Sequence, residues 1–395
     1  MLPAFTPEFT HQSPQMRVVF RPRAVEALAQ ELARTGIARP LLLSSASVAR
    51  SAAYARIRAD LGTLPLLAYE GVPAHSSLDL VEQLTREARA FEADGLIAIG
   101  GGSTSDSAKA IALLLAEGGR LADHASSFTP PDRLHMPELK CPKLPIVAIP
   151  TTASAAEVTP GLGVRNAQGA KLLFSDLKLV SRVILIDPLL NLGVPAALML
   201  STGMNGLAHC IEGLYARTRS PLAVALAEYA IPRFLRALPA LARAPHEMAP
   251  RAELLSAAHL SGQVLLGART CLHHALCHVL GAMTGVAHGD VNSVMLPAVM
   301  DFNLPAATAE LAQAARVAGL AGREVDDQAA ARALIMTVAG LRAQIGVPTR
   351  LRDLGVRREQ LAAVARHTLG ERGLYFNPRP VLTAAPLQEL LEQAW

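Results

Sequence analysis

Several histidines in the second half of this chain fall at spacings that could do chemistry, since imidazole rings bind metal ions and exchange protons near neutral pH. Residues four apart on a helix lie on one face, one turn above each other. Polar residues have this spacing in two pairs, Asn205 with His209 and His274 with His278. His288 follows past two glycines and could fold back onto the same pocket.

Two interpretations of this cluster are open. A histidine in a protein core often only satisfies a backbone carbonyl, and a lone pair of histidines would favour that interpretation. Two pairs with a returning histidine in apolar surroundings instead predict a functional site, with His273 as a further candidate for substrate contact. The residues alone leave open whether this site holds a metal ion or a substrate.

A glycine-rich turn in the first half of the chain has the character of a phosphate-binding site. An apolar run ends in Gly100, Gly101 and Gly102, and Ser103 and Asp106 open the helical stretch that follows. Glycines let the backbone approach a ligand closely, and the free N–H groups of a helix start attract phosphate. The alternative is an ordinary turn whose hydroxyls and aspartate cap the helix. The motif differs from the GxGxxG fingerprint.

Hydroxyl-bearing side chains follow another predicted strand. Residues 143–149 predict a strand, and Thr151, Thr152 and Ser154 come directly after it. Ligands of parallel sheets bind at the C-terminal mouth of the strands, so we expect a binding role beside the glycine turn. A polar loop with local side-chain-to-backbone hydrogen bonds is the alternative. No carboxylate precedes Ser44 at the end of its strand, which weakens any preference for NAD over NADPH.

Composition excludes several classes of function. A chain of 395 residues with 51% hydrophobic residues predicts two domains with large cores. Only 4% of the residues are aromatic and the net charge is +4, which argues against a nucleic-acid partner. Apolar runs are broken well before about 18 residues, so no membrane span is expected. Residues 1–16 do not resemble a signal peptide, and four cysteines without a CxxC pair predict a reduced, cytoplasmic protein.

The elements that position these residues change character along the chain. Strand patterns alternate with helical ones up to about residue 188, which predicts a helix-covered parallel sheet. Strands are expected at 17–21, 40–45, 64–69, 95–100, 143–149 and 183–186, and helices at 24–36, 47–61 and 77–93. Later patterns are helical, at 195–216, 221–243, 249–268, 270–283, 290–303, 306–319, 326–345, 358–369 and 386–394. We therefore expect an α/β domain over 1–188, an all-helical domain over 189–395, and Asp187 as a helix cap between them.

Together these motifs resemble the iron-containing alcohol dehydrogenase superfamily, which is similar in fold to dehydroquinate synthase. The resemblance covers roughly residues 17–395 and implies an active-site cleft between the two domains and, by analogy, a homodimer. It also implies that the glycine turn and the threonine-rich turn hold NADH or NADPH. We add Lys171 as a further candidate, because its cation could reach the same cleft. The family holds its catalytic metal with one aspartate and three histidines, at positions that match Asn205, His209, His274 and His288.

Asn205 stands where that family has aspartate, so three neutral imidazoles would hold a divalent cation alone. Three histidines suffice in some zinc enzymes, but the lost charge favours a site without a catalytic metal. This departure, with the histidine-rich stretch 272–281 and the sequence Asn377-Pro-Arg-Pro380, resembles the maleylacetate reductase branch. That branch implies reduction of maleylacetate to 3-oxoadipate, with NADH or NADPH, in the bacterial degradation of aromatic compounds.

The chemistry of that substrate agrees with a site lacking a metal. Its double bond is conjugated with a ketone, so hydride addition produces an enolate that hydrogen-bond donors can stabilise. We assign enolate stabilisation and proton delivery to His274, His278 and His288, and substrate orientation to His209 and Asn205. The residues do not decide which histidine donates the proton.

Two substrate carboxylates require cationic partners, for which Arg269 and Arg379 are candidates; a surface arginine in a proline-rich tail is the alternative for Arg379. Two other functions stay open for the chain. One is a metal-dependent alcohol dehydrogenase that tolerates Asn205, and the other is a nucleotide- or metabolite-binding relative without turnover.

Overall fold

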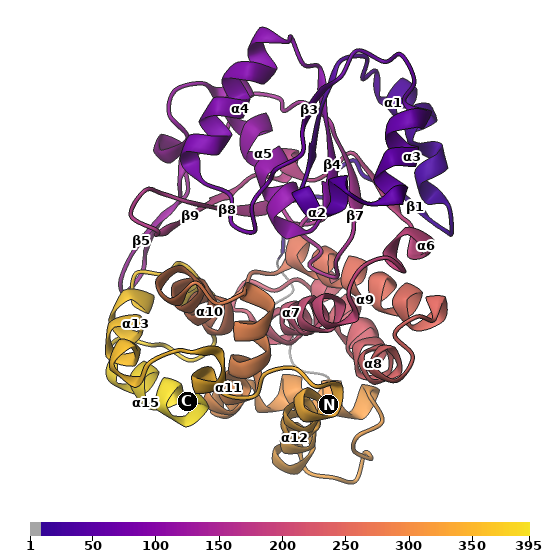
Figure 1. Ribbon diagram of the computed structural model, residues 1–395. Coiled ribbons are helices and arrows are strands. Elements are labelled where there is room, and N and C mark those ends of the chain that lie inside the picture. Colours follow the sequence, from indigo (N-terminus) through magenta and orange to yellow (C-terminus); the bar gives the residue numbers. More distant parts are fainter. Residues whose placement is uncertain (1–8) are drawn as a thin grey trace. The chain divides into compact units, whose positions relative to one another are not determined.

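The computed structural model describes residues 9–395, which divide into two compact units (Figure 1). An α/β unit contains Ser13–Ser126 and Met136–Pro195. A helical unit contains residues 9–12, Ser127–His135 and Ala196–Trp395. The predicted succession of an α/β part and an all-helical part is confirmed. None of the helices in the described residues is long and apolar enough to span a membrane.

The α/β unit is built on a sheet of six parallel strands. In spatial order they are β1 (Arg17–Phe20), β10 (Val183–Ile186), β7 (Ile146–Pro150), β4 (Gly95–Gly100), β2 (Pro40–Ser44) and β3 (Leu67–Tyr69). Every residue of the inner strands β2, β4, β7 and β10 is buried, as expected of a sheet covered on both faces.

Helices cover the two faces of this sheet (Figure 1). On one face α1 (Leu28–Thr35) and α3 (Ala52–Asp60) share a core with Leu42 of β2. On the other, α4 (Leu78–Ala90) and α5 (Gly102–Glu117) share a core with Leu41 and Leu43. Successive side chains of a strand point to opposite faces, so adjacent leucines of one strand serve different cores.

Local capping and an additional hairpin distinguish this unit from the predicted pattern. The helix expected over 47–61 is interrupted, because Ser51 Oγ accepts the Tyr54 N–H and starts a new helix there. A hairpin of β8 (Gly161–Arg165) and β9 (Lys171–Ser175) was not expected from the sequence.

The smaller elements are η1 (Ala24–Ala27), α2 (Ala46–Ala49), η2 (Leu121–His124), η3 (Leu177–Leu179) and α6 (Pro188–Asn191). Asp187 caps α6, as predicted.

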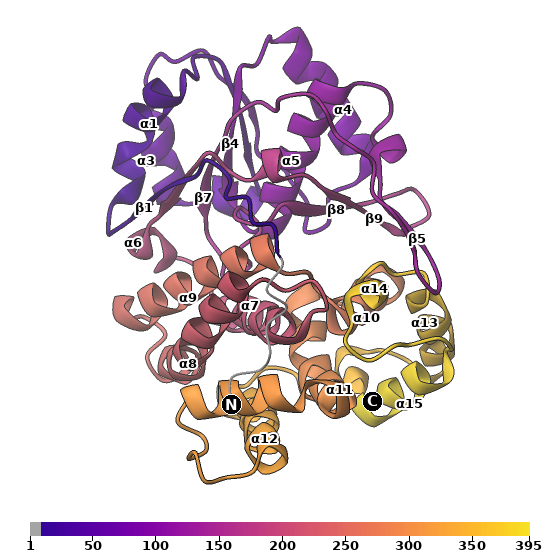
Figure 2. The ribbon, with the colours of Figure 1, turned by 180° about the vertical axis from the view of Figure 1, so that it is seen from behind.

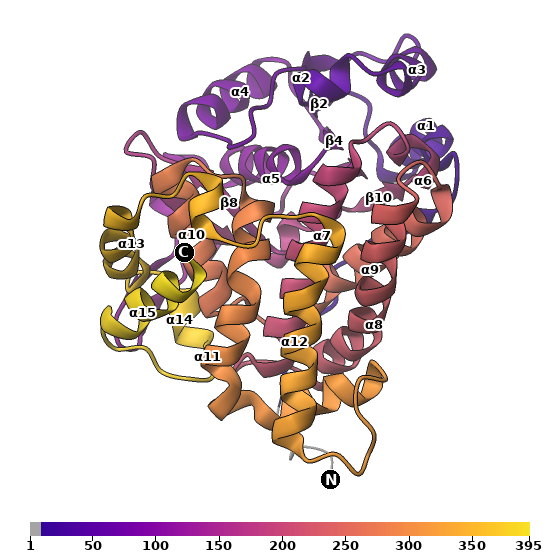
Figure 3. The same ribbon diagram turned by 60° about the horizontal axis from the view of Figure 1, so that its bottom comes forward.

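The helical unit is organised around α7, which packs against α8, α9 and α11 (Figure 2). In Figure 3, α12 lies alongside α11. The helices are α7 (Ala196–Tyr215), α8 (Pro221–Arg243), α9 (Met248–Gly267), α10 (Leu272–Thr284), α11 (His288–Val317), α12 (Asp327–Ile345), α13 (Leu361–Thr368), α14 (Gly373–Phe376) and α15 (Ala385–Ala394). Two short 3-10 turns, η4 (Leu351–Leu354) and η5 (Arg358–Gln360), precede α13.

One feature of this unit agrees with the predicted pattern and another was not predicted. The helices expected at 290–303 and 306–319 are both present within α11, separated by a kink at Ala307, where the backbone is non-helical (φ −139°, ψ 20°) just after Pro305. A hairpin of β5 (Ser127–Thr129) and β6 (Arg133–His135) belongs to this unit, although it comes from the first half of the chain. Phe128 of that hairpin packs against the helical core, which ties the hairpin to these helices.

Candidate active site

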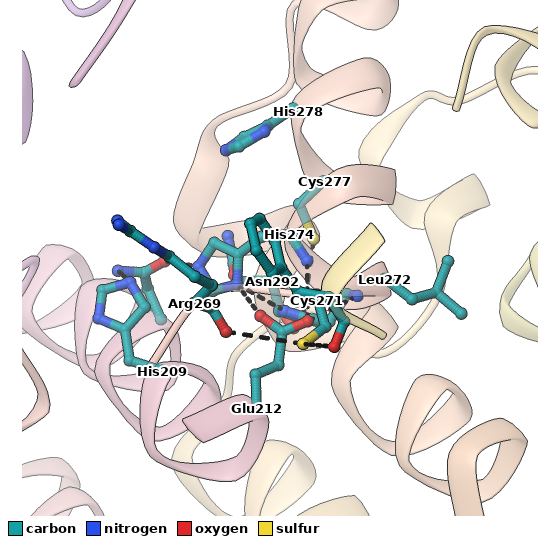
Figure 4. A network of polar contacts seen from close by, with 12 residues as sticks. His209, Glu212, Arg269, Cys271, Leu272, His274, Cys277, His278 and Asn292 are labelled. Carbon is teal, nitrogen blue, oxygen red and sulfur yellow. Dashed lines mark hydrogen bonds and ion pairs between the residues drawn. The ribbon is translucent and has the colours of Figure 1, made fainter. Parts of the chain in front are cut away.

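Three helices of the helical unit bring the predicted histidines together. Asn205 and His209 lie on α7, His273, His274 and His278 on α10, and His288 begins α11. The His209 and His274 rings stack with centroids 4.9 Å apart, and the His278 and His288 rings stack at 5.7 Å. His274 and His288 stand 5.8 Å apart, so one continuous group of rings results. Figure 4 shows how several of these side chains meet.

The side-chain amide of Asn205 joins two of these histidines. Ser261 Oγ donates to the Ala258 carbonyl at 2.8 Å, so its oxygen accepts from His209 Nδ1, 3.5 Å away. That leaves His209 Nε2 as an acceptor for Asn205 Nδ2 at 3.3 Å. Asn205 Oδ1 in turn accepts from His274 Nε2 at 3.2 Å. One amide therefore satisfies the facing nitrogens of both rings.

Close helix packing makes this chain of hydrogen bonds possible. Gly206 follows Asn205 on α7, and a Cβ there would lie 2.6 Å from Phe234 Cζ and 3.2 Å from Ser261 Oγ. Without a side chain at Gly206, α8 and α9 approach α7 closely enough for Ser261 to reach His209. Asn205, His209 and His274 are at most 6% exposed, so these contacts are shielded from water.

The donor set at the predicted metal positions lacks the negative charge that favours a divalent cation. Asn205 contributes a neutral amide, and the Nε2 atoms of His209 and His274, which would bind the metal, already bond that amide. A negative ligand offsets part of the lost hydration of a buried dication, and this set of neutral donors lacks that contribution. Ligand atoms of Glu212, His273 and His274 also lie within 4.8 Å of one another. The Glu212 oxygens, however, are engaged with α10 and with His274 Nδ1.

Glu212 is a member of the site that sequence reasoning missed. It is completely buried, and its Oε2 lies 2.6 Å from His274 Nδ1. Burial raises the pKa of Glu212 to about 7, against the opposing effects of His273 and of backbone N–H groups. A signal existed in the sequence, because Asn205, His209 and Glu212 continue one face of a helix at spacings of four and three.

His273 was expected to contact substrate, and its surroundings do not support that role. Its ring is 0% exposed, and Nε2 lies 3.0 Å from the Asn292 carbonyl. Burial, and next the neighbouring His274, lower its pKa to about 4. A neutral, enclosed imidazole bonded to backbone matches the alternative of a core histidine.

Charged side chains accompany His278, which with His288 is one of the two partly exposed histidines of the cluster. His278 Nδ1 lies 3.2 Å from Glu371 Oε2. Next to Glu371, Arg372 is a second residue that sequence reasoning missed. Burial, and then the nearby Arg269, lower the pKa of Arg372 to about 10. Arg269 therefore has a second guanidinium in its neighbourhood, and Figure 4 shows its side chain on the same side of the network as His209.

The other predicted substrate residue, Arg379, lies elsewhere. Its side chain is exposed, its guanidinium stands 4.0 Å from the centre of the Phe302 ring, and Nη1 donates to the Phe302 carbonyl at 2.8 Å. Phe302 is 14 residues after His288 on α11, which corresponds to about 20 Å along the helix. Arg379 therefore matches the alternative of a surface arginine.

The glycine turn in the α/β unit joins β4 to α5. Gly101 is the N-cap of α5 and makes no side-chain cap hydrogen bond. Asp106 does not cap the helix, because its Oδ2 accepts the Gly163 N–H at 3.1 Å, and Ser103 donates to the Ala74 carbonyl. The contacts of Ser103 and Asp106 therefore do not support the alternative of a turn whose own side chains cap the helix.

The threonine-rich turn lies directly beside the glycine turn, as expected for neighbouring parallel strands. Thr151 N–H donates to the Gly100 carbonyl at 2.9 Å. A Cβ on Gly101 would lie 3.0 Å from Thr152 Cγ2, so the two backbones meet closely. Thr152 Oγ1 also bonds Ser154 Oγ at 3.2 Å. These residues form a polar turn next to the start of α5, where phosphate binding is favoured.

Lys171 comes from the hairpin that the sequence did not predict. It pairs across the strands with Arg165 and extends over Gly163, where a Cβ would lie 2.0 Å from Lys171 Cε. Asp106 bonds the same glycine, so Lys171 reaches the second turn of α5. Burial, then Arg165 and Lys171, lower the pKa of His75 to about 4. Sequence reasoning missed His75, which is neutral near pH 7, and Arg165, which with Lys171 makes this end of the unit basic.

Comparison with known proteins places the chain among oxidoreductases. Residues 14–188 match the family described as iron-containing alcohol dehydrogenase, and residues 199–395 match the C-terminal part of the Fe-containing alcohol dehydrogenase family. A maleylacetate reductase of Pseudomonas knackmussii is 32% identical over 390 residues, covering 98% of this chain and 97% of that protein.

Solved structures agree with this assignment. The crystal structure of maleylacetate reductase from Agrobacterium tumefaciens is 28% identical and matches with a TM-score of 0.80, covering 99% of each chain. A 1,3-propanediol oxidoreductase is 27% identical with a TM-score of 0.90, covering 98% of this chain and 100% of that one. The motifs predicted this relationship, and the chain belongs to the iron-containing alcohol dehydrogenase family, on the branch of the maleylacetate reductases.

Proposed function

We propose that this oxidoreductase reduces maleylacetate to 3-oxoadipate with NADH or NADPH, and that it does so without a catalytic metal. The observation that carries the proposal is the Asn205 amide, which bonds both histidine nitrogens that would otherwise bind a cation. The similarity to maleylacetate reductases over nearly the whole chain supports the choice of substrate.

The cofactor would be held in the α/β unit. Its phosphates suit the turn of Gly100, Gly101 and Gly102 at the start of α5, where backbone N–H groups and the helix dipole favour negative charge. Further contacts are assigned to the residues around that turn, namely Ser103, Asp106, Thr151, Thr152, Ser154 and Lys171. Arg165 strengthens the positive charge there, because it pairs with Lys171 across the hairpin.

The histidine cluster would act on the substrate. When bound, the reduced nicotinamide supplies a hydride to the alkene carbon β to the ketone, and negative charge develops on the ketone oxygen as an enolate. Among the histidines, His278 and His288 are the partly exposed pair, and they suit donation to that oxygen and delivery of a proton to the α carbon. His274 supports them from the buried side of the cluster, while His209 and Asn205 fix its orientation.

The substrate carries two carboxylates, which need cationic partners. Arg269 and Arg372 offer two guanidinium groups, and Arg269 is close enough to lower the pKa of Arg372, which follows Glu371 of the His278–Glu371 pair. Guanidinium groups match carboxylates in geometry and stay protonated even when partly buried. We therefore assign carboxylate binding to these two residues, with Arg372 taking the role that the sequence pattern suggested for Arg379.

Oxidation of NADH and NADPH, followed by absorbance, tests the proposal. We expect turnover with maleylacetate that survives dialysis against a chelator, with 3-oxoadipate as the product. Activity that is lost with the chelator and regained with Fe²⁺ or Zn²⁺ would contradict the metal-free part. A metal-dependent alcohol dehydrogenase, which the likeness to the 1,3-propanediol oxidoreductase keeps as the second candidate, would instead oxidise simple alcohols.

Nucleotide binding without any turnover would indicate a non-catalytic relative. We further propose a cytoplasmic homodimer, by analogy with the family, which light scattering after gel filtration measures directly.

A further inference from the structure

Glu212 connects the two helices that carry most of the histidines. Its side chain leaves α7 and is 0% exposed. Oε1 accepts the N–H groups of His273 at 2.8 Å and of His274 at 3.4 Å, while Oε2 lies 2.6 Å from His274 Nδ1. The same carboxylate thus holds both the backbone and the ring of His274, and Figure 4 shows it beneath that ring.

The start of α10 depends on this carboxylate. The first N–H groups of a helix find no acceptor within the helix, and Cys271 at the N-cap makes no side-chain cap hydrogen bond. Asn377 Oδ1 accepts the Leu272 N–H at 3.3 Å, and Glu212 supplies the acceptor for the next two N–H groups from the neighbouring helix. A negative charge at this end also interacts favourably with the helix dipole. Glu212 therefore fixes where α10 begins and how it is held against α7.

The orientation of the His274 ring depends on the same group. The two nitrogens of an imidazole are distinct, and the partner of one decides the direction and hydrogen of the other. With Nδ1 held at 2.6 Å by Glu212, Nε2 faces Asn205 Oδ1 at 3.2 Å. A ring without that partner could turn over about its Cβ–Cγ bond and exchange the two edges.

We propose that Glu212 is a positioning residue for the reaction, which caps α10 and fixes the ring edge that His274 presents to Asn205. It touches neither the substrate nor the cofactor. This inference rests on the proposed function, since it assumes that His274 takes part in turnover. The orientation of the His274 ring can nevertheless be tested without substrate.

Two substitutions separate the capping role from the positioning role. In Glu212→Gln, the amide oxygen can still accept the N–H groups of α10, but the amide nitrogen then faces His274 Nδ1 as a donor. In Glu212→Ala both contacts are lost. We expect the melting temperature to fall in the alanine variant and to be largely restored in the glutamine variant. At pH 9 we expect kcat to fall by about 10- to 100-fold in both, with KM for maleylacetate changed by less than about threefold.

Asp187 provides a matched control, because it is a buried carboxylate that caps a helix without touching a histidine in any contact observed within residues 9–395. Its Oδ1 accepts the N–H groups of Leu189 and Leu190 at the start of α6. We expect Asp187→Ala, which removes this cap, to lower the melting temperature but to leave kcat unchanged. A glutamine variant at 212 with wild-type kcat, or an equal loss of kcat in the Asp187 control, overturns the positioning role.

The His274 ring can be followed directly by ¹⁵N NMR of histidine-labelled protein at pH 9, with a His274→Gln variant to identify its signals. We expect both ring nitrogens to carry hydrogen in the wild type, Nε2 toward Asn205 and Nδ1 toward Glu212, and we expect Nδ1 to lose its hydrogen in Glu212→Gln. Unchanged His274 signals overturn the inference even if the enzyme turns over maleylacetate. Changed signals in a protein that does not reduce maleylacetate support the positioning of His274 and refute only the proposed substrate.

Discussion

Replacing Asn205 by aspartate should convert the histidine cluster into a metal site. The amide of Asn205 lies 3.3 Å from His209 Nε2 and 3.2 Å from His274 Nε2. The opposite edges of both rings are already held, by Ser261 and by Glu212. Such outer hydrogen bonds orient metal-binding histidines, so the missing component is a negative charge at position 205.

The size of the effect follows from that charge. At an effective dielectric constant of about 20, a carboxylate and a dication about 3 Å apart attract each other by about 10 kcal/mol. Burying the carboxylate at a site that is 5% exposed costs several kcal/mol of this attraction. A net gain of about 3–5 kcal/mol remains, which strengthens cation binding about 100- to several thousand-fold.

Isothermal titration of Zn²⁺ into Asn205→Asp and wild-type protein measures this difference. Asn303→Asp is the matched control, since Asn303 is also buried in the helical unit but pairs with Asn377. We expect tight binding only in the Asn205 variant. A wild-type protein that binds Zn²⁺ as tightly as the variant would refute the reasoning, as would a variant with no gain.

Three further substitutions test other parts of the structure. His278→Ala should lower kcat by about 100-fold or more, because a proton-transfer group is removed, and near-normal turnover would exclude His278 from the mechanism. Gly100→Val should raise the dissociation constant of NADH at least about tenfold, because a Cβ there would lie 2.4 Å from Thr104 Oγ1 and would displace the turn. Fluorescence titration measures this dissociation constant. An unchanged affinity for NADH would contradict the role of the turn. Burial lowers the pKa of His259 from 6.5 to about 4, so its contribution to stability is present above pH 6.5 and is lost as the pH falls toward 4. Urea unfolding at pH 5 should therefore show that His259→Gln avoids a loss of about 2 kcal/mol that wild type suffers relative to pH 7.5, and equal losses in both proteins would be inconsistent with this assignment.

Much of the fold could be predicted because its signals are local. Buried strands such as β2 and β4 are short apolar runs bounded by turn residues, and their alternation with helices predicts a parallel sheet. The hairpin of β8 and β9 was missed because it is inserted in the sequence between β7 and β10 and forms a separate two-stranded sheet. Its turn carries Asn166, whose side chain accepts two backbone N–H groups, and this was a usable signal.

The sequence by itself determined which residues could form the site. A spacing of four on α7 and α10 predicted the rows of Asn205 with His209 and of His274 with His278, because helix geometry repeats every 3.6 residues. The absence of a carboxylate at position 205 is likewise a property of the sequence alone, since it depends on residue type and not on packing.

Only the tertiary structure decided which of these groups meet and which face a ligand. It enclosed His273, placed Arg379 on Phe302, and brought Glu212 and Arg372 into the site. Periodicity describes one helix at a time, whereas these outcomes depend on how helices distant in sequence pack against one another. Close packing at small residues such as Gly206 fixes those contacts, and no local pattern in the chain specifies them.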